Sequence, residues 1–326
     1  MIYENLYEEV LIKPTTVGAN KLFIVSGYAT AAMAFHHVSE AKKINENIQV
    51  NLVVGMCPTD GLSLSNFIAF KELVNNQFPS NFQCSYLTVR PPVHTKLYIW
   101  FKEDEPLLAY LGSANYTQNG FSGKTMREAL TLCETEKAYN YYTKILGDTI
   151  YCNHNDVEDL ICIYKDNFHS SKRKKLRPSE GVESATYDFE DDIPKCVASL
   201  LDRSGHLPER SGLNWGQRPE QHREPNQAYI RLPLEIARTD FFPPVKVHFT
   251  VRTDDNKVII CTRAQSQGKA IHTPHNNSLL GEYFRSRLGI PNGEKVTLEH
   301  LVSYGRTDIS FYKLDEETYF MDFSVT

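Results

Sequence analysis

The chain has 326 residues, 41% of them hydrophobic and 11% aromatic, which excludes a disordered protein and predicts two globular domains. The net charge of −5 does not by itself indicate nucleic-acid binding, but the distribution of charge matters more than its total. No apolar run reaches the roughly 18 residues of a membrane helix, and the N-terminus lacks a signal-peptide pattern, so we expect a cytoplasmic protein with no membrane contact. The seven cysteines form no CxxC pair, and we expect their thiols to be reduced.

The first half of the chain alternates between strand and helix patterns. Predicted strands cover Lys21–Tyr28, Ile48–Gly55, Gln83–Val89 and Ala129–Cys133, and Val93–Phe101 with Pro106–Gly112 form a predicted hairpin. Predicted helices cover Ala29–Ile44, Leu62–Val74 and Glu136–Leu146. This alternation predicts an α/β domain, a sheet flanked by helices.

A charged stretch with few apolar residues, from about Ser170 to Asp192, separates this half from a second composition. We therefore expect a first domain at 1–169, a charged linker at 170–195 and a second domain at 196–326. In the second domain the predicted strands are Ala228–Leu234, Lys246–Arg252, Lys257–Thr262, Thr307–Lys313 and Thr318–Phe323. One clear helix, Ser278–Leu288, ends at Gly289. Many short strands predict a mainly-β, barrel-like module.

Two residues of the predicted hairpin, His94 and Lys96, form the first part of a candidate active site. Residues two apart on an extended segment share one face, so the imidazole and the ammonium should project together. An imidazole nitrogen can attack phosphorus and form a covalent intermediate. A fixed ammonium beside it lowers the barrier for attack on an anionic phosphodiester.

The segment Gly112–Asn115 follows on the predicted partner strand and supplies neutral donors. Ser113 and Asn115 can donate to the non-bridging phosphate oxygens from a turn that Gly112 permits. Glu128 can accept a hydrogen bond from a ring nitrogen of His94, or of a symmetry-related histidine, and fix its tautomer. Each piece alone is an ordinary strand or turn, whereas the ordered set indicates a phosphodiesterase.

The order of His94-x-Lys96, Gly112-Ser113-x-Asn115 and a trailing Glu128 resembles the signature of the phospholipase D superfamily. The resemblance implies a nucleophilic histidine and no required metal or other cofactor. Members often have Asp five residues after the lysine, where this chain has Phe101. Because nuclease members often lack that Asp, the departure argues against a lipid hydrolase.

Members of the superfamily use two copies of the motif, whereas this chain has one. No other histidine has Lys two positions later. We therefore predict a homodimer through the nuclease domain, in which one His94 attacks phosphorus and the other protonates the leaving oxygen.

Two polar loops of the second half, about 210–226 and 263–273, carry side chains that can read DNA. Arg reads guanine, and Asn or Gln reads adenine, by bidentate hydrogen bonds in the major groove. Loops that are simply solvated are the plain alternative. The predicted DNA-contacting residues are Arg210, Asn214, Trp215, Gln217, Arg218, Arg223, Asn226, Arg263, Gln265, Gln267, Lys269, His272 and Thr273.

The second half resembles the C-terminal domain of NgoFVII-type restriction endonucleases, a plant B-three-like pseudobarrel behind a phospholipase D-like nuclease. The resembling stretches are SGLNWGQR, NQAYIRLP, DFFPP, RAQSQGKAIHTPHNNSLLGEYFRSRLG and YGRTDISFYKLDEETYFMDF. The resemblance implies that the two loops are arms that grip the major groove of double-stranded DNA. It also makes a separate ATPase- or helicase-like subunit and a cognate DNA methyltransferase candidate partners.

Together these patterns predict a type II-like, sequence-specific restriction endonuclease that cuts through a phosphohistidine. Two alternatives stay open: a phospholipase D-type lipid phosphodiesterase, and a DNA-binding protein that does not cleave. The acidic run Glu180–Asp192 suggests a further hypothesis, in which it covers the active site as a DNA mimic until target DNA binds. A solvated tether is the alternative for that run.

Overall fold

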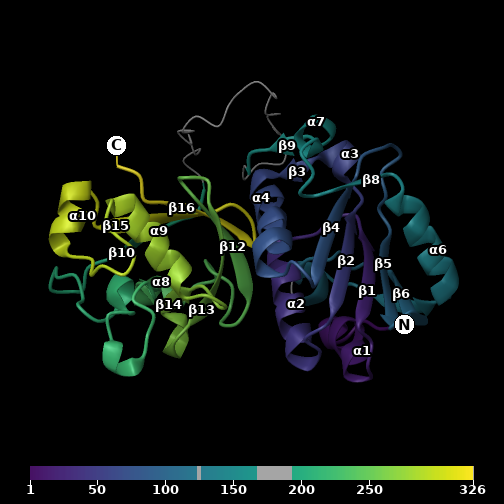
Figure 1. The fold of residues 1–326 in the computed structure, drawn as a ribbon, viewed down its shortest axis with the longest axis horizontal. Helices are drawn as coiled ribbons and strands as arrows, with labels where there is room; N and C mark the ends of the chain where they lie inside the picture. Colours follow the sequence, from purple (N-terminus) through teal and green to yellow (C-terminus); the bar gives the residue numbers. More distant parts are fainter. Residues whose placement is uncertain (123–125, 167–192, 326) are drawn as a thin grey trace. The chain divides into compact units, whose positions relative to one another are not determined.

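The computed structural model describes residues 1–122, 126–166 and 193–325, which fall into two compact units, Met1–Glu183 and Ser184–Thr326 (Figure 1). The acidic run Glu180–Asp192 lies outside the described residues. The predicted boundaries of the linker therefore stay a prediction.

A seven-stranded mixed sheet forms the centre of the N-terminal unit. In spatial order its strands are β7 (Leu130–Cys133), β6 (Glu105–Gly112), β5 (Lys96–Lys102), β1 (Lys21–Ser26), β2 (Gln49–Val54), β4 (Phe82–Leu87) and β8 (Thr149–Tyr151). Strands β1, β2 and β4 run parallel, and every other neighbouring pair is antiparallel. The predicted hairpin is β5 and β6.

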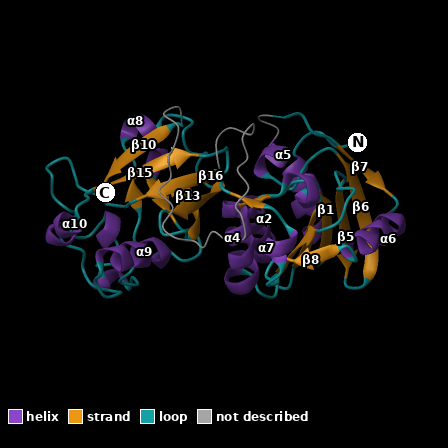
Figure 2. Cartoon of the chain, turned by 90° about the horizontal axis from the view of Figure 1, so that it is seen from above, coloured by secondary structure: helices purple, strands orange, loops and turns teal. Residues whose placement is uncertain are grey.

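Helices cover both faces of this sheet, which confirms the predicted α/β class. Figure 2 shows α2 (Ala31–Ile44) and α4 (Leu64–Glu72) on one side and α6 (Thr135–Leu146) on the other. The apolar face of α6 packs against buried residues of β1, β2, β4, β5 and β6. The shorter helical segments are η1 (Tyr7–Ile12), α1 (Lys13–Thr16), α3 (Cys57–Asp60), η2 (Leu73–Gln77), α5 (Gln118–Ser122) and α7 (Val157–Leu160).

The helix predicted from Leu62 begins two residues later. Leu62 and Ser63 form a short strand, β3 (Leu62–Ser63), that pairs with β9 (Ile163–Tyr164). The Ser63 side chain then caps α4 by accepting a hydrogen bond from the backbone N–H of Asn66.

A second seven-stranded sheet forms the C-terminal unit. In spatial order its strands are β10 (Lys195–Ser199), β15 (Asp308–Lys313), β16 (Thr318–Asp322), β12 (His248–Thr253), β13 (Val258–Ala264), β14 (Ala270–His272) and β11 (Ile230–Arg231). The outer strands β10 and β11 approach each other, so the sheet nearly closes. This closure confirms the predicted mainly-β pseudobarrel.

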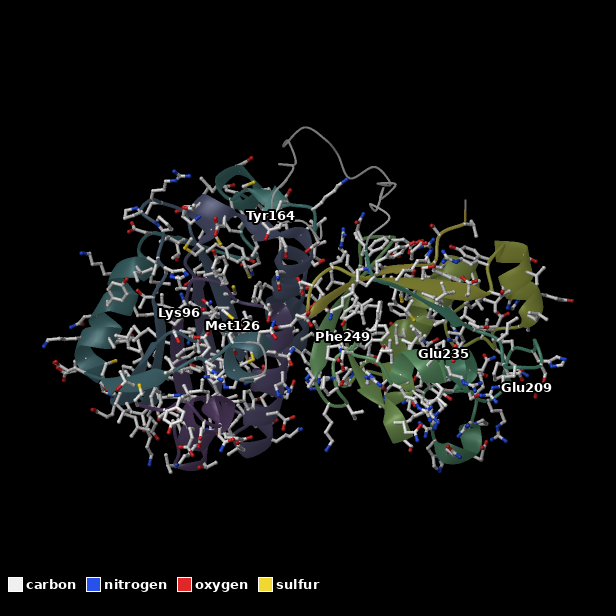
Figure 3. All side chains as sticks on the ribbon, turned by 180° about the vertical axis from the view of Figure 1, so that it is seen from behind. Lys96, Met126, Tyr164, Glu209, Glu235 and Phe249 are labelled. Atoms are coloured by element: carbon white, nitrogen blue, oxygen red, sulfur yellow. The ribbon has the colours of Figure 1, made fainter. Side chains whose placement is uncertain are left out.

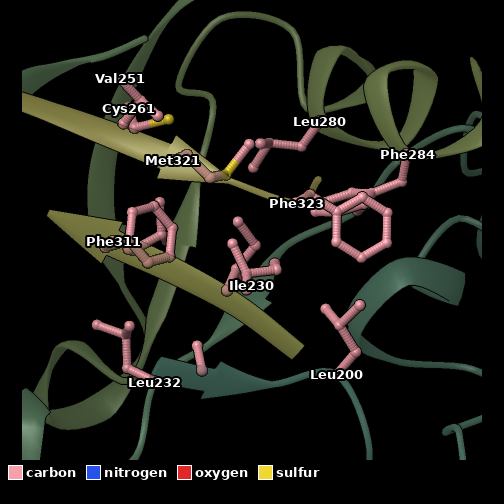
Figure 4. Packing of buried hydrophobic residues seen from close by; sticks show 14 of the residues in the cluster. Leu200, Ile230, Leu232, Val251, Cys261, Leu280, Phe284, Phe311, Met321 and Phe323 are labelled. Atoms are coloured by element: carbon pink, nitrogen blue, oxygen red, sulfur yellow. The ribbon is translucent and has the colours of Figure 1, made fainter. Parts of the chain in front are cut away.

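The interior of the nearly closed sheet is filled by aliphatic and aromatic side chains from strands and helices (Figure 4). Phe311, Met321 and Val251 come from the strands, and Leu280 and Phe284 come from α9 (Ser278–Leu288). The bounds of α9 are those predicted. The remaining helical segments are η3 (Gly212–Asn214), η4 (Pro219–Gln221), α8 (Leu234–Ala237), η5 (Ser266–Gly268) and α10 (Leu298–Tyr304).

The strand predicted over Ala228–Leu234 is wrong over most of its length. Strand pairing covers only Ile230 and Arg231, because Pro233 has no N–H for a ladder and Leu234 already begins α8. Strands β10 and β14 and helix α10 were not predicted. Their apolar patterns are too short to stand out from the surrounding loops.

Candidate active site and nucleic-acid interface

The register of three neighbouring strands gathers the predicted catalytic segments at one end of the N-terminal sheet. Lys96 begins β5 and pairs with Gly112 at the end of β6, and Gly112 pairs with Leu130 at the start of β7. The segments that carry the rest of the motif leave these strands at this end. A Cβ on Gly112 would lie 2.1 Å from the carbonyl oxygen of Ala129, so only glycine permits this approach.

His94 and Lys96 lie together but in different surroundings. Strand pairing begins at Lys96, so His94 precedes the strand by two residues and is exposed, whereas Lys96 is 5% exposed (Figure 3 marks Lys96). The Lys96 ammonium donates to the carbonyl oxygen of His94 at 2.5 Å. Burial lowers the pKa of Lys96, and the nearby Glu128 carboxylate opposes this shift. Lys96 and Glu128 are therefore electrostatic neighbours.

The segment after β6 is held in place by backbone contacts. The Ser113 hydroxyl accepts a hydrogen bond from the backbone N–H of Ala129 at 3.1 Å and is itself exposed. The Tyr98 hydroxyl donates to the carbonyl oxygen of Ala114 at 2.7 Å, and burial raises the pKa of Tyr98, so this donor keeps its proton. Asn115, one residue further, is thereby carried on a fixed stretch of main chain.

Glu128 does not reach His94 in the single chain. Among the described residues no hydrogen bond links the two side chains, so the pairing of Glu128 with a symmetry-related histidine stays a prediction. No group of three or more His, Cys, Asp and Glu side chains within the described ranges is placed to hold a metal ion. No helix in the same residues is long and apolar enough to cross a membrane.

The turn after β1 was missed by the sequence reasoning. The Tyr28 ring lies edge-on to the His94 ring, with 6.0 Å between centroids, and the Tyr28 hydroxyl donates to the Asp60 carboxylate. The backbone N–H of Tyr28 donates to Oδ1 of Asn115 at 3.2 Å. No local pattern marks this turn, because only the pairing of β1 with β5 brings it to the motif.

In the C-terminal unit, Arg263 of β13 points inward. It is 6% exposed, and burial lowers its pKa. Its guanidinium donates to the backbone carbonyl oxygens of Ala237, Phe242, Pro243, Gln267 and Gly268. In this structure the side chain fastens the loop after β13 to the segment before β12, and it does not face outward.

Three polar residues of the first arm are also tied to the backbone of their own unit. The buried Asn214 side chain donates to the carbonyl of Val296 at 2.8 Å and accepts from its N–H at 2.9 Å. The Gln217 amide donates to the carbonyl of Gly293 at 3.0 Å, and Asn226 Oδ1 accepts from the N–H of Gly293 at 2.7 Å. These contacts shape the arm from inside.

The other predicted residues of the first arm reach its surface. The Arg223 guanidinium stacks 4.1 Å from the centroid of the Trp215 ring. Arg210 forms an ion pair with Glu220, and Arg218 Nε donates to the carbonyl oxygen of Arg210 at 2.8 Å. These arginines keep further donors for a ligand.

The second arm likewise has some side chains that reach the surface and others that bond within its own unit. Gln265 and Gln267 are exposed and have φ of +65° and +62°, which shape a tight loop, and Lys269 is half-buried. His272 Nδ1 lies 2.8 Å from the Asn277 side-chain oxygen. The buried Thr273 hydroxyl donates to the backbone of its own loop.

Two adjoining cavities of about 310 and 180 Å³ lie beside the seam between β10 and β11. Both are lined by Arg231 and Lys269. The larger is also lined by Arg203, Asp202 and Glu235, of which Figure 3 labels Glu235, and the smaller by Gln265. Within residues 193–325 no hydrogen bond or ion pair engages the side chains of Arg203, Arg231 or Lys269.

Neither Arg203 nor Arg231 was predicted to contact DNA. The alternation of β11 is the signal that could have found Arg231, since it follows the buried Ile230 and therefore turns outward. Arg203, Arg231 and Lys269 thus line a concave surface, which they share with the carboxylates of Asp202 and Glu235.

Two family models match the chain. The model of the NgoFVII restriction endonuclease N-terminal PLD domain matches residues 4–159, and that of the NgoFVII C-terminal B3-like DNA-binding domain matches residues 188–315. No curated protein sequence matches the chain.

Solved structures also match the chain. NucT from Helicobacter pylori is 17% identical, with 46% of this chain and 96% of that chain covered and a TM-score of 0.34. Nuc from Salmonella typhimurium, a phospholipase D family member, is 15% identical, with 44% and 89% covered and a TM-score of 0.33. The polyphosphate kinase from Porphyromonas gingivalis is 11% identical, with 47% and 24% covered and a TM-score of 0.28.

Proposed function

Because the chain belongs to the NgoFVII restriction endonuclease family, and is thus a DNA-cleaving nuclease of the phospholipase D type, we propose that it cuts duplex DNA at a defined sequence through a phosphohistidine on His94. The observation that carries the proposal is the strand register. It supports the proposal because Lys96, Gly112 and Leu130 pair side by side, so the segments that carry the motif leave the sheet at the same end, within the unit that matches the nuclease model.

The reaction runs in two displacements within a homodimer. A ring nitrogen of His94 attacks phosphorus, the N–P bond forms as the bond to the leaving deoxyribose oxygen breaks, and the partner subunit's His94 protonates that oxygen. Water then attacks phosphorus, the N–P bond breaks, and the proton of the water passes to the partner's His94. No atom changes its oxidation state in either step. No metal is required in this mechanism, because the histidines carry the protons and the lysines stabilise the negative charge at phosphorus.

The other motif residues stabilise the charge that develops at phosphorus. The Lys96 ammonium, held by the carbonyl of His94, faces an anionic transition state. Ser113 and the amide nitrogen of Asn115 donate to the non-bridging oxygens. Glu128 accepts from a histidine of the dimer and fixes its tautomer. The exposure of His94 supports a shared site, because it leaves the ring accessible to a second subunit.

DNA recognition belongs to the C-terminal unit in this proposal. Support comes from the concave surface of Arg203, Arg231 and Lys269, whose donors can bind phosphates or the acceptor edge of guanine. The outward side chains of the two arms extend this surface: Arg210, Trp215, Arg218, Arg223, Gln265 and Gln267. The inward ones, such as Asn214 and Arg263, hold the arms in shape.

Cleavage of plasmid DNA in EDTA by the wild-type protein and by His94→Ala tests the chemistry. The expected result is cutting at defined ends by the wild type and none by the variant. Residual cutting by the variant would overturn the phosphohistidine, scattered ends would overturn sequence specificity, and cutting only with added metal would overturn metal independence. A parallel reaction adds ATP and a separately encoded ATPase subunit, because a missing partner would mimic an inactive enzyme.

Subunit mixing tests the dimeric site. After exchange of equal amounts of wild-type and His94→Ala chains, a site that needs both histidines retains about a quarter of the wild-type activity, since about a quarter of the dimers carry both. Independent sites would retain about half.

A separate assay tests the lipid alternative. Hydrolysis of phosphatidylcholine vesicles without DNA cleavage would favour the lipid alternative.

A further inference from the structure

Ser26, the last residue of β1, joins two segments of the candidate active site. It is fully buried, and its hydroxyl donates to the carbonyl oxygen of Tyr28 at 2.6 Å. The same oxygen accepts the backbone N–H of Tyr116 at 2.9 Å. A hydroxyl has one proton and two lone pairs, so it can satisfy both partners at once. Ser26 therefore ties the turn after β1 to the residue that follows Asn115.

The turn held by Ser26 decides the orientation of the Asn115 amide. The backbone N–H of Tyr28 lies 3.2 Å from Oδ1 of Asn115. A backbone N–H only donates, so the amide atom that faces it must be oxygen. Nδ2 is then directed away from the turn and is left to donate elsewhere. Ser26 Oγ lies 3.4 Å from the same Oδ1, so it also contacts the oxygen side of the amide.

Gly27, in the middle of the turn, is where His94 and Asn115 meet. A Cβ on Gly27 would lie 3.0 Å from Cδ2 of His94 and 3.4 Å from Oδ1 of Asn115. The turn is thus the shared support of the proposed nucleophile and of one proposed phosphate donor.

We propose that Ser26 is a positioning residue for phosphodiester cleavage, because it holds the turn that directs the Asn115 amide nitrogen toward the phosphate. This rests on the function proposed above. Without the hydroxyl, the Tyr28 carbonyl loses a donor and the buried Tyr116 N–H loses its acceptor, so the turn and the amide are free to shift. The loss should fall on kcat and leave DNA affinity unchanged, because Ser26 is buried in the nuclease unit.

A double-mutant cycle with Ser26→Ala, Asn115→Ala and the double variant tests this, read as the single-turnover cleavage rate and the DNA Kd. We expect Ser26→Ala to slow cleavage about 10- to 100-fold, the scale of a misplaced catalytic group, with Kd unchanged. The double variant should be no slower than Asn115→Ala alone. Effects that multiply would overturn the proposal, because Ser26 would then act independently of Asn115.

Two further variants separate positioning from folding. Ser39→Ala is the matched control, since Ser39 is 6% exposed and its hydroxyl donates within its own helix α2, to the carbonyl of Phe35 at 2.5 Å. It should keep the wild-type rate. Ser26→Thr retains the hydroxyl and should recover most of the rate lost in Ser26→Ala.

If Ser26→Ala does not fold, Gly27→Ala tests the same support. Its methyl group would press on the His94 ring and should lower kcat with Kd unchanged, whereas an unchanged kcat would overturn the proposal. An inactive wild-type protein would instead count against the proposed function, and an active wild type with an unaffected Ser26→Ala would count against this inference alone.

Discussion

The two units differ in how their predicted functional residues are placed. In the N-terminal unit, antiparallel pairing places Lys96, Gly112 and Leu130 side by side at one end of the sheet, so the segments that carry the motif leave their strands at that end. In the C-terminal unit, the predicted residues lie mostly on loops, where some turn outward and others turn to their own backbone. The strand register thus brings the predicted catalytic segments to one end of a sheet, whereas the predicted loop residues have no shared register to align them.

Arg263 and Arg231 show the reason for the difference. Both lie on strands of the same sheet, but Arg263 donates to backbone carbonyls of neighbouring loop and helical segments, whereas Arg231 faces a cavity. A buried carbonyl oxygen needs a donor, and a guanidinium supplies five. A residue type suited to reading bases is equally suited to holding a loop.

The largest expected effect is on the chemistry of the N-terminal unit. Lys96→Ala should slow single-turnover cleavage by about 1,000-fold, because in the proposed mechanism it removes the cation that stabilises the charge developing at phosphorus. Filter binding should show an unchanged DNA Kd, since the proposed contacts lie in the other unit. A loss below about tenfold would show that strand register alone does not identify the site.

The next effect should be on the stability of the C-terminal unit. Arg263→Ala removes the donor of several buried carbonyls and should lower the free energy of unfolding by about 3 kcal/mol. Arg231→Ala is the matched variant and should change it by less than about 0.5 kcal/mol. Urea unfolding of the two variants measures this, and equal losses would contradict the inward and outward assignments.

Arg231 should matter more for DNA affinity than for stability. Arg231→Ala should weaken binding about 10- to 100-fold and flatten the dependence of affinity on salt, because a phosphate or guanine contact is lost. Isothermal titration at two salt concentrations measures both. Lys295→Ala is the control, since Lys295 pairs with Glu209 and does not line either cavity. Unchanged affinity in Arg231→Ala would place recognition elsewhere.

Acid should destabilise the N-terminal unit first. His37 is fully buried, with Nδ1 2.7 Å from the Tyr116 hydroxyl and Nε2 3.1 Å from the carbonyl of Leu11, and burial lowers its pKa to about 3. Between pH 6.5 and 3 the unfolded chain binds a proton that the folded chain does not. Stability should therefore fall by up to about 1.4 kcal/mol per pH unit as the pH drops.

Calorimetry between pH 7 and 4 tests this order. The transition of the N-terminal unit should move down in temperature before that of the C-terminal unit, and His37→Gln should flatten its pH dependence while lowering stability at pH 7. Parallel shifts of both transitions, or an unchanged slope in the variant, would refute the assignment to His37.

The smallest effect concerns a carboxylate of the C-terminal unit. Burial alone would raise the pKa of Asp322, but hydrogen bonds from Ser324 and Arg306 outweigh it and the pKa is lowered. Its stabilisation is present above the unfolded value of 3.8 and is lost as the pH falls through the lower folded value. Asp322→Asn should cost about 1 kcal/mol at pH 7 in urea unfolding, and the difference should shrink below pH 4; a constant difference would contradict it.

Local pattern was enough to predict much of the fold. The strand and helix alternation of the first half, the bounds of α9 and the barrel-like strands of the second half are periodic segments whose apolar residues face one side. The strand predicted over Ala228–Leu234 was wrong over most of its length because Pro233 interrupts the ladder and Leu234 already begins α8.

The sequence by itself was enough to predict the candidate catalytic motif, because His94, Lys96 and the Gly112–Asn115 turn are close along the chain and joined by one hairpin. Only the tertiary structure decided that Ser26 and Tyr28 lie against that motif, since β1 pairs with β5 across more than 60 intervening residues. It also decided that Arg263 turns inward and Arg231 outward. The physical reason is that periodicity is a local property, whereas the partner of a polar group depends on which distant backbone the fold brings beside it.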